Sequence, residues 1–266
     1  MIFLKGLLGA RLSTVQRICL SGLFIAIVTI LQKVLAINYI PVIPFLRISL
    51  GGPALIIFAS IFLGPIYGMM IGIASDVIGY FVFDPKTMGF FPQITAIYGV
   101  LGLLSFFIFW LLKLIKNKTV MLIVEGVTFV GLLTFVSLFL FLNDNLQLYS
   151  STYTLLLWQK ILIVSILLVL LSVIFFFTIF FDKKFKEDKL PLSPITVSFT
   201  CFLIEAIVMV LFGTLMKGLA FGFQTYPMIL VCQILVMFIN VPLNTWLILL
   251  LCRITSRFYK DKSAQV

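Results

Sequence analysis

The chain has 266 residues, of which 62% are hydrophobic and 11% are charged, and its formal net charge is +10. Mean hydropathy is +1.25. A soluble domain of this size could not bury so much apolar surface, so we predict an all-α, polytopic transmembrane helical bundle. The positive charges stand in clusters between apolar runs, which membrane topology explains better than nucleic-acid binding does.

Residue types that carry common chemistry are missing or scattered. The chain has no histidine, the commonest general base and metal ligand. Its four cysteines stand alone within apolar runs, which indicates small buried side chains rather than a metal site or a disulfide. No phosphate-binding glycine loop, nucleophile elbow or pair of catalytic carboxylates occurs. We therefore expect no enzyme activity, no cofactor and no metal site.

Apolar runs along the chain predict about eight membrane-scale helices, at residues 14–37, 51–63, 66–83, 93–114, 119–142, 155–181, 194–216 and 228–252. Ser13 is placed to cap the first helix. The second is short for a full span, so we expect it to be tilted or partly re-entrant. Residues 38–50 contain two prolines and should form an outer loop that carries Arg47. Residues 143–154 should form a polar loop.

Basic residues indicate the orientation. With the N-terminus inside, the lysines of 113–118 and of 183–189 and the basic residues of both termini fall on the cytoplasmic side. The outer loops then hold only Arg47, Lys86 and Lys217. We expect a multi-pass protein of the cell membrane with both termini in the cytoplasm.

Asp76 is an acid inside an apolar run, where insertion of a carboxylate costs about 2.5–3.5 kcal/mol, and such a residue indicates a functional site. Tyr80 follows at i+4, on the same helix face. The carboxylate can accept hydrogen bonds from an N–H-bearing heterocycle, and the phenol can stack on the ring or donate to it. The alternative is that Asp76 pairs with Lys33 or Lys160 as a structural lock.

Four other charged residues lie in or beside the predicted helices. Lys33 and Arg47, near the outer ends of their elements, could meet an anionic group of a ligand, although Lys33 could instead extend toward the membrane interface. Glu125 and Glu205 are expected near cytoplasmic helix ends, where surface exposure or pairing with lysines would explain them.

Amides and small residues indicate contacts between helices. Gln233, Asn240 and Asn244 recur at roughly helical spacing in the last helix, where they could bind a ligand or join helices. Gly22 and Ala26 lie one turn apart and allow another helix to approach, either a partner protein or a neighbour in the bundle.

The Gly64-Pro65 pair predicts a tight turn between the second and third helices. Gly68 and Gly72 follow on one face of the third helix. We expect this face to pack closely on another helix, the alternative being that the glycines remove bulk beside a ligand cavity.

Residues 47–102 contain RISLGGPALIIFASIFLGPIYGMMIGIASDVIGY and FFPQITAIYGVLG, in that order. These stretches resemble the substrate-binding (S) component of energy-coupling factor (ECF) vitamin transporters, most closely the folate family. Residues 228–251 resemble the last helix of that family, including Pro242. Residues 119–182 fall outside the resemblance, as a helix pair inserted into a six-helix core within a single transmembrane domain. The core helices then occupy residues 14–118 and 190–256.

The resemblance implies a vitamin bound in an outward-facing cavity that the loop after the first helix covers. It also implies delivery through a transmembrane coupling subunit and two cytoplasmic ATPases, as in an ABC importer. Gly22 and Ala26 match the motif that contacts the coupling subunit, with glycine in place of the first alanine. Asp76 and Tyr80 match the pair that contacts the pterin ring of folate.

Two positions depart from the family. Lys33 and Gln233 stand where ligand-binding arginines are expected, and neither reproduces the fork geometry that suits a dicarboxylate. We predict a vitamin-capturing S component for folate or a related small vitamin, with Asp76, Tyr80, Lys33, Arg47 and Gln233 as the binding residues. The alternative is a membrane-embedded enzyme, or a scaffold without a transport role. The inserted pair should pack outside the bundle and line none of the ligand cavity.

Overall fold

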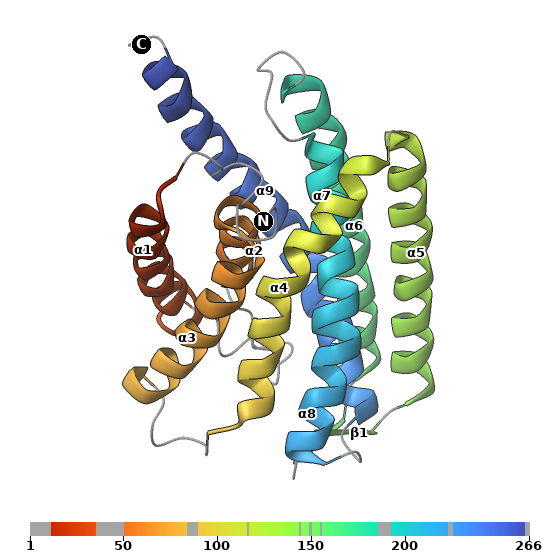
Figure 1. Ribbon diagram of the computed structural model, residues 1–266. Helices are drawn as coiled ribbons and strands as arrows, with labels where there is room; N and C mark the ends of the chain where they lie inside the picture. The colour runs from red at the N-terminus through yellow and green to blue at the C-terminus, as the bar shows by residue number, and fades with distance from the viewer. Residues whose placement is uncertain are drawn as a thin grey trace.

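The structure is a computed structural model, and it describes residues 12–35, 51–83, 90–115, 117–143, 145–148, 151–154, 156–185, 193–222 and 226–263. These residues form a bundle of helices (Figure 1). Seven helical stretches in this part are long and apolar enough to cross a membrane. The protein is therefore a multi-pass membrane protein, and the predicted all-α polytopic bundle is confirmed.

The first half of the chain supplies α1 (Thr14–Lys33), α2 (Gly52–Leu63), α3 (Pro65–Phe83) and α4 (Pro92–Leu114). Ser13 caps α1 as predicted: its side chain accepts a hydrogen bond from the Gln16 amide, and Gln16 returns one to the backbone N–H of Ser13. Proline at the first position of α4 suits a helix start, because its missing N–H would have no partner there.

The second half supplies α5 (Lys118–Leu142), α6 (Leu157–Phe185), α7 (Pro194–Ile204), η2 (Glu205–Phe212), α8 (Gly213–Phe221) and α9 (Tyr226–Ser263). The helices α7, η2 and α8 follow one another without a break and form one span. Its central segment, η2, is a π-helix of eight residues. Helices of this kind are rare, and π turns inside α-helices often occur at functional sites.

The segment between α5 and α6 differs from the prediction. Residues 143–154 were expected to form a polar loop, but β1 (Asn145–Leu148) and β2 (Ser151–Thr154) pair as an antiparallel hairpin. Leu146 lies opposite Tyr153, and Gln147 lies opposite Thr152. β-branched and aromatic residues favour strands, so the polar composition of the segment concealed its strand preference.

The short helix α2 forms the centre of one half of the bundle. All twelve of its residues are buried, and it packs against α1, α3, α4 and α9. Twelve residues rise only about 18 Å, less than the hydrocarbon thickness of a bilayer. Because other helices surround α2, its length need not match the thickness of the membrane. At the last residue of α2, Leu63, the carbonyl oxygen accepts a hydrogen bond from the Arg17 guanidinium at 3.3 Å.

The backbones of α3 and α4 touch through glycines. A Cβ atom added at Gly72 would overlap the carbonyl oxygen of Tyr98, and one at Gly102 would overlap that of Gly68. Ser60 of α2 donates its hydroxyl to the carbonyl oxygen of Gly102 at the same contact. The glycine face of α3 therefore packs closely on a neighbouring helix, as the sequence predicted. The tight turn before it is also confirmed: Gly64, with φ 120°, alone separates α2 from α3.

Helices α5 and α6 lie at one edge of the bundle, and α1 lies at the opposite edge (Figure 1). Helices α5 and α6 contact each other, and both also contact α7 and α9. Only 17% of the apolar window of α5 and 24% of that of α6 are buried, against 61% for the span at Pro194–Ala220. The pair is thus peripheral, and most of its surface is available to lipid.

The α3–α4 contact should fail when a methyl group is inserted. Gly72→Ala would force the two backbones apart, and overpacking of this kind costs about 1–3 kcal/mol. We expect the melting temperature of the purified protein in detergent to fall by at least about 2 °C. Gly131→Ala in α5 is the matched control, because no atom lies within 4 Å of the added carbon. Equal melting temperatures for the two variants would contradict the close contact.

Candidate functional site

Asp76 and Thr95 join α3 to α4 inside the bundle. The Thr95 hydroxyl donates to Oδ2 of Asp76 at 2.6 Å, and the two side chains are only 6% and 7% exposed. Asp76 follows Gly72 by one helical turn, and Thr95 precedes Tyr98 by one turn. The glycine contact therefore brings the carboxylate and the hydroxyl together, and the acid is held in one orientation.

The C-terminal end of α1 packs against the same part of α3. A Cβ atom added at Gly79 would lie 2.8 Å from Cε of Lys33, so the lysine chain packs on α3 at Gly79, about one turn after Asp76 and next to Tyr80 in the sequence. The Thr29 hydroxyl donates to the carbonyl oxygen of Ser75, which directly precedes the acid. Lys33 is half-buried. The structure thus brings a cationic side chain to the helix segment that carries the predicted pair.

Aromatic rings surround Tyr80 at the end of α3. Its ring centroid lies 5.3 Å from the ring centroids of both Phe81 and Phe90, and those two phenylalanines stack at 5.9 Å. Phe90 lies just before α4. Edge and offset contacts of this kind are the arrangements that aromatic pairs prefer. A flat aromatic ligand could join this cluster by stacking, one helical turn from the Asp76 carboxylate.

The other two predicted binding residues, Arg47 and Gln233, are not established in this group. Arg47 lies outside the described residues. Gln233 is half-buried on α9, and no described contact within residues 51–83 and 226–263 joins it to Asp76 or Tyr80. Both remain predictions from the sequence.

The predicted partner-binding residues lie on an open face of α1. Gly22 and Ala26 are exposed, and no atom lies within 4 Å of a Cβ added at Gly22. On the described surface, this pair therefore does not serve packing within the bundle, which was the alternative explanation.

The lysine that the sequence offered as a second partner for Asp76 lies elsewhere. Lys160 donates to the carbonyl oxygen of Asn143 at 3.2 Å, and so joins the start of α6 to the end of α5. The Lys160 side chain therefore joins α5 to α6 and does not act as the partner of Asp76.

Glu125 and Glu205 correct the sequence prediction. Both were expected near cytoplasmic helix ends, as exposed residues or paired with lysines, but each side chain is only 1% exposed. Glu125 of α5 accepts a hydrogen bond from Ser198 of α7 at 2.9 Å. Glu205 accepts one from the side-chain amide of Asn244 in α9 at 2.9 Å. Each acid therefore joins two helices, because a carboxylate in apolar surroundings needs a hydrogen-bond donor.

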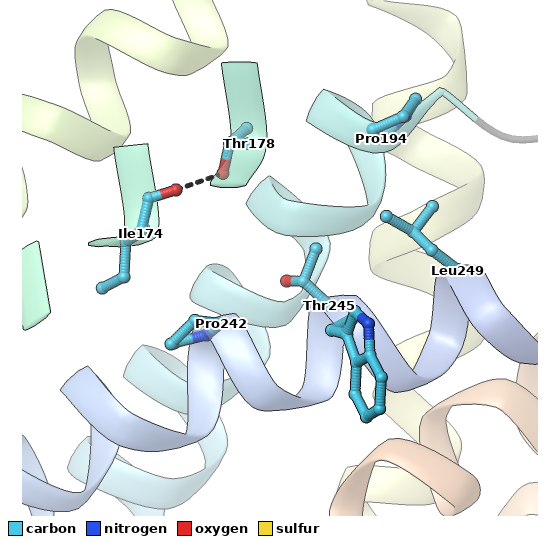
Figure 2. Close-up of a pocket in the computed structure, with 7 residues that line it drawn as sticks. Ile174, Thr178, Pro194, Pro242, Thr245 and Leu249 are labelled. Carbon is cyan, nitrogen blue, oxygen red and sulfur yellow. Dashed lines mark hydrogen bonds between the residues drawn. The ribbon is translucent and has the colours of Figure 1, made fainter. Parts of the chain in front are cut away.

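A pocket lies between α6, α7 and α9, away from Asp76. Figure 2 shows its lining of mostly apolar side chains, from Ile174, Thr178, Pro194, Pro242, Thr245, Trp246 and Leu249. Its hydroxyls already donate within their own helices, Thr178 to Ile174 and Thr245 to Val241. The pocket therefore lacks a polar group that is committed to a ligand.

Sequence reasoning missed Thr95, the partner of Asp76. The signal available was its place in the first turn of an apolar helix, four residues after Phe91. A hydroxyl there is commonly satisfied by its own helix, so only the packing of α3 on α4 identifies the acid as its acceptor.

Comparison of the chain with protein-family models, with curated proteins and with solved structures gave no match.

The hydrogen bond between Thr95 and Asp76 should contribute measurably to stability. Thr95→Val keeps the side-chain shape but leaves a buried carboxylate oxygen without its donor, which costs about 1–3 kcal/mol. We expect a lower melting temperature for Thr95→Val and a value near wild type for Thr95→Ser, which keeps the hydroxyl. The control is Thr200→Val, because the buried Thr200 hydroxyl donates only to its own helix, at Thr196. If Thr95→Val and Thr200→Val behave alike, the bond does not hold the acid.

Proposed function

We propose that this chain is the substrate-binding component of an ECF-type importer and captures folate or a related small vitamin. The proposal starts from the family-like order of sequence in residues 47–102. The observation that carries it is the buried Asp76 carboxylate, which Thr95 orients beside an aromatic cluster and a lysine. An intramembrane acid with fixed neighbours is a functional-site hypothesis by default.

The chemistry of this group suits a flat heterocycle that bears N–H donors. An ionised carboxylate has about four acceptor positions on its two oxygens, so the single bond from Thr95 leaves capacity for ligand N–H groups. Tyr80 and its neighbouring phenylalanines offer ring faces and edges for stacking. Lys33 offers a cation for an anionic part of the ligand. Lysine and glutamine, rather than arginine, stand at positions 33 and 233. This favours a ligand whose acidic part is bound by a single ammonium charge rather than by the paired hydrogen bonds of a guanidinium.

The open face of α1 supports the coupling part of the proposal. Gly22 and Ala26 are exposed on a helix that contacts only one side of the bundle, at α2 and α3 among the described elements. Small residues at this spacing allow another transmembrane helix to approach closely. The partner would be the transmembrane coupling subunit, on which two ATPases act from the cytoplasm. Both termini of this chain would lie in the cytoplasm, in the cell membrane.

Removing the charge of Asp76 should weaken vitamin binding. Asp76→Asn replaces a charged acceptor by a neutral amide in a desolvated position, and we expect at least about a tenfold rise in Kd. The measurement is equilibrium binding of folate and a panel of small vitamins to the purified protein in nanodiscs. Glu125→Gln is the control, since that buried acid bonds Ser198 at the other side of the bundle. If Asp76→Asn binds its vitamin as the wild type does, the site is elsewhere; if no vitamin binds the wild type, an enzyme or scaffold becomes the better hypothesis.

A bulky residue on the open face of α1 should separate capture from uptake. Gly22→Leu and Ala26→Leu should bind the vitamin normally, because Gly22 and Ala26 lie apart from Asp76 on an exposed surface. Uptake into proteoliposomes that also contain the coupling subunit and both ATPases should be abolished, since close helix approach is lost. The matched control is Gly131→Leu, another glycine with open space around it. Parallel loss of binding and uptake would instead indicate a fault in the bundle itself.

A further inference from the structure

Glu205 belongs to a polar cluster in the middle of the bundle that the vitamin site does not use. Glu205 is the first residue of η2, and its side chain is only 1% exposed. Asn244 of α9 donates its amide N–H to Oε1 of Glu205 at 2.9 Å. Asn240 lies one turn before Asn244, on the same face of α9, and is buried as well. We name these three side chains the Glu205 cluster.

The hydrogen bonding of the Glu205 cluster is incomplete. The Oδ1 atoms of Asn240 and Asn244 are buried and have no hydrogen-bond partner in the described structure. Their side chains are only 4% and 0% exposed, so lipid or water at the surface does not reach them. An unpaired buried acceptor carries the full penalty of its lost hydration. The cluster therefore differs from a satisfied structural link, in which every acceptor has a donor.

A cation beside Glu205 could be coordinated by oxygens of all three side chains. Carboxylate and amide oxygens are the ligands that hard metal ions prefer. A half-turn of a terminal amide exchanges its oxygen and nitrogen, so each asparagine can turn its oxygen toward Glu205, and Asn244 then gives up its hydrogen bond to the carboxylate. The one carboxylate balances a single positive charge. A divalent ion would leave a net charge among apolar helices, which is costly.

The position of the cluster also suits an ion. Glu205 begins the π-helical segment of its span, and Pro242 lies between the two asparagines on α9. In secondary transporters, ion sites typically lie near the bilayer midplane, where helices are interrupted. We propose that the Glu205 cluster binds a monovalent metal cation, for which Na⁺ is the probe. The site shares no residue with the Asp76 group and does not depend on the vitamin proposal.

Two other cations compete for this role. Lys217 lies further along the same span and could balance the charge of Glu205. A proton on the carboxylate could also do so, by donating to one asparagine oxygen. Both differ from a metal ion in a simple way, because neither makes the protein respond to sodium at constant pH and ionic strength.

The test is the stability of the purified protein in NaCl against choline chloride at equal concentration and pH. Sodium is raised stepwise to about 200 mM, and at a concentration about tenfold above Kd we expect the melting temperature to rise by about 3 °C or more. Glu205→Gln and Asn240→Leu should abolish this rise. Glu125→Gln, which removes another buried acid, should keep it, as should Lys217→Gln. Binding of ²²Na⁺ to the wild type should reach one ion per chain, a readout that does not need a folded variant.

The outcomes separate the hypotheses. A melting temperature that is the same in sodium and choline, together with no bound ²²Na⁺, overturns the cation site. So does a sodium effect that survives in Glu205→Gln. A melting temperature that changes with pH but not with sodium assigns the position to a proton and also overturns the proposal. The vitamin-binding assay with Asp76→Asn is unaffected by any of these results, so the two proposals fail independently.

Discussion

The backbones of α3 and α4 touch where Gly72 meets Tyr98 and where Gly68 meets Gly102, without side chains between them. This contact determines the position of much else in the first half of the bundle. It leaves Asp76 and Thr95 facing each other one turn further along, and so fixes the orientation of a buried carboxylate. Larger residues at the contact would separate the helices by more than a hydrogen bond can span.

Buried acids serve as links between helices in this bundle. Asp76 accepts from Thr95, Glu125 from Ser198 and Glu205 from Asn244, each across two different helices. The common cause is the apolar surroundings, in which a carboxylate must find its donors within the protein. Burial of an acid therefore does not by itself indicate a ligand site. What distinguishes the surroundings of Asp76 is the aromatic cluster and Lys33. Buried oxygens without a partner among the described residues occur at both other acids, namely Oε2 of Glu125 and the Oδ1 atoms of the two asparagines beside Glu205, and the pair of amides is what sets Glu205 apart.

A small polar network attaches the helix pair α5 and α6 to α7. Ser198 of α7 bonds Glu125 of α5 and lies 3.4 Å from the hydroxyl of Thr178 in α6. All three side chains are buried, although most of α5 and α6 faces outward. Specific hydrogen bonds can fix helices in lipid, where apolar contacts with a helix and with acyl chains are nearly equivalent. This explains how a peripheral pair keeps a defined place beside α7 and α9.

The sequence by itself determined the fold class, the cap at Ser13 and most helix boundaries to within a few residues, since hydropathy and helix-ending residues are local signals. The exceptions are two helix ends that lie further along the chain than predicted, at Phe221 of α8 and at Ser263 of α9. It also identified Asp76 as an unusual intramembrane acid. Only the tertiary structure decided which residue holds that acid, that Glu125 and Glu205 are buried, and that Asn244 reaches Glu205. Those facts depend on pairs such as Glu205 and Asn244, 39 residues apart, and no local pattern specifies which faces of two apolar helices meet. The hairpin at β1 and β2 was missed for a related reason, because a polar segment shows its strand character only when its two halves pair.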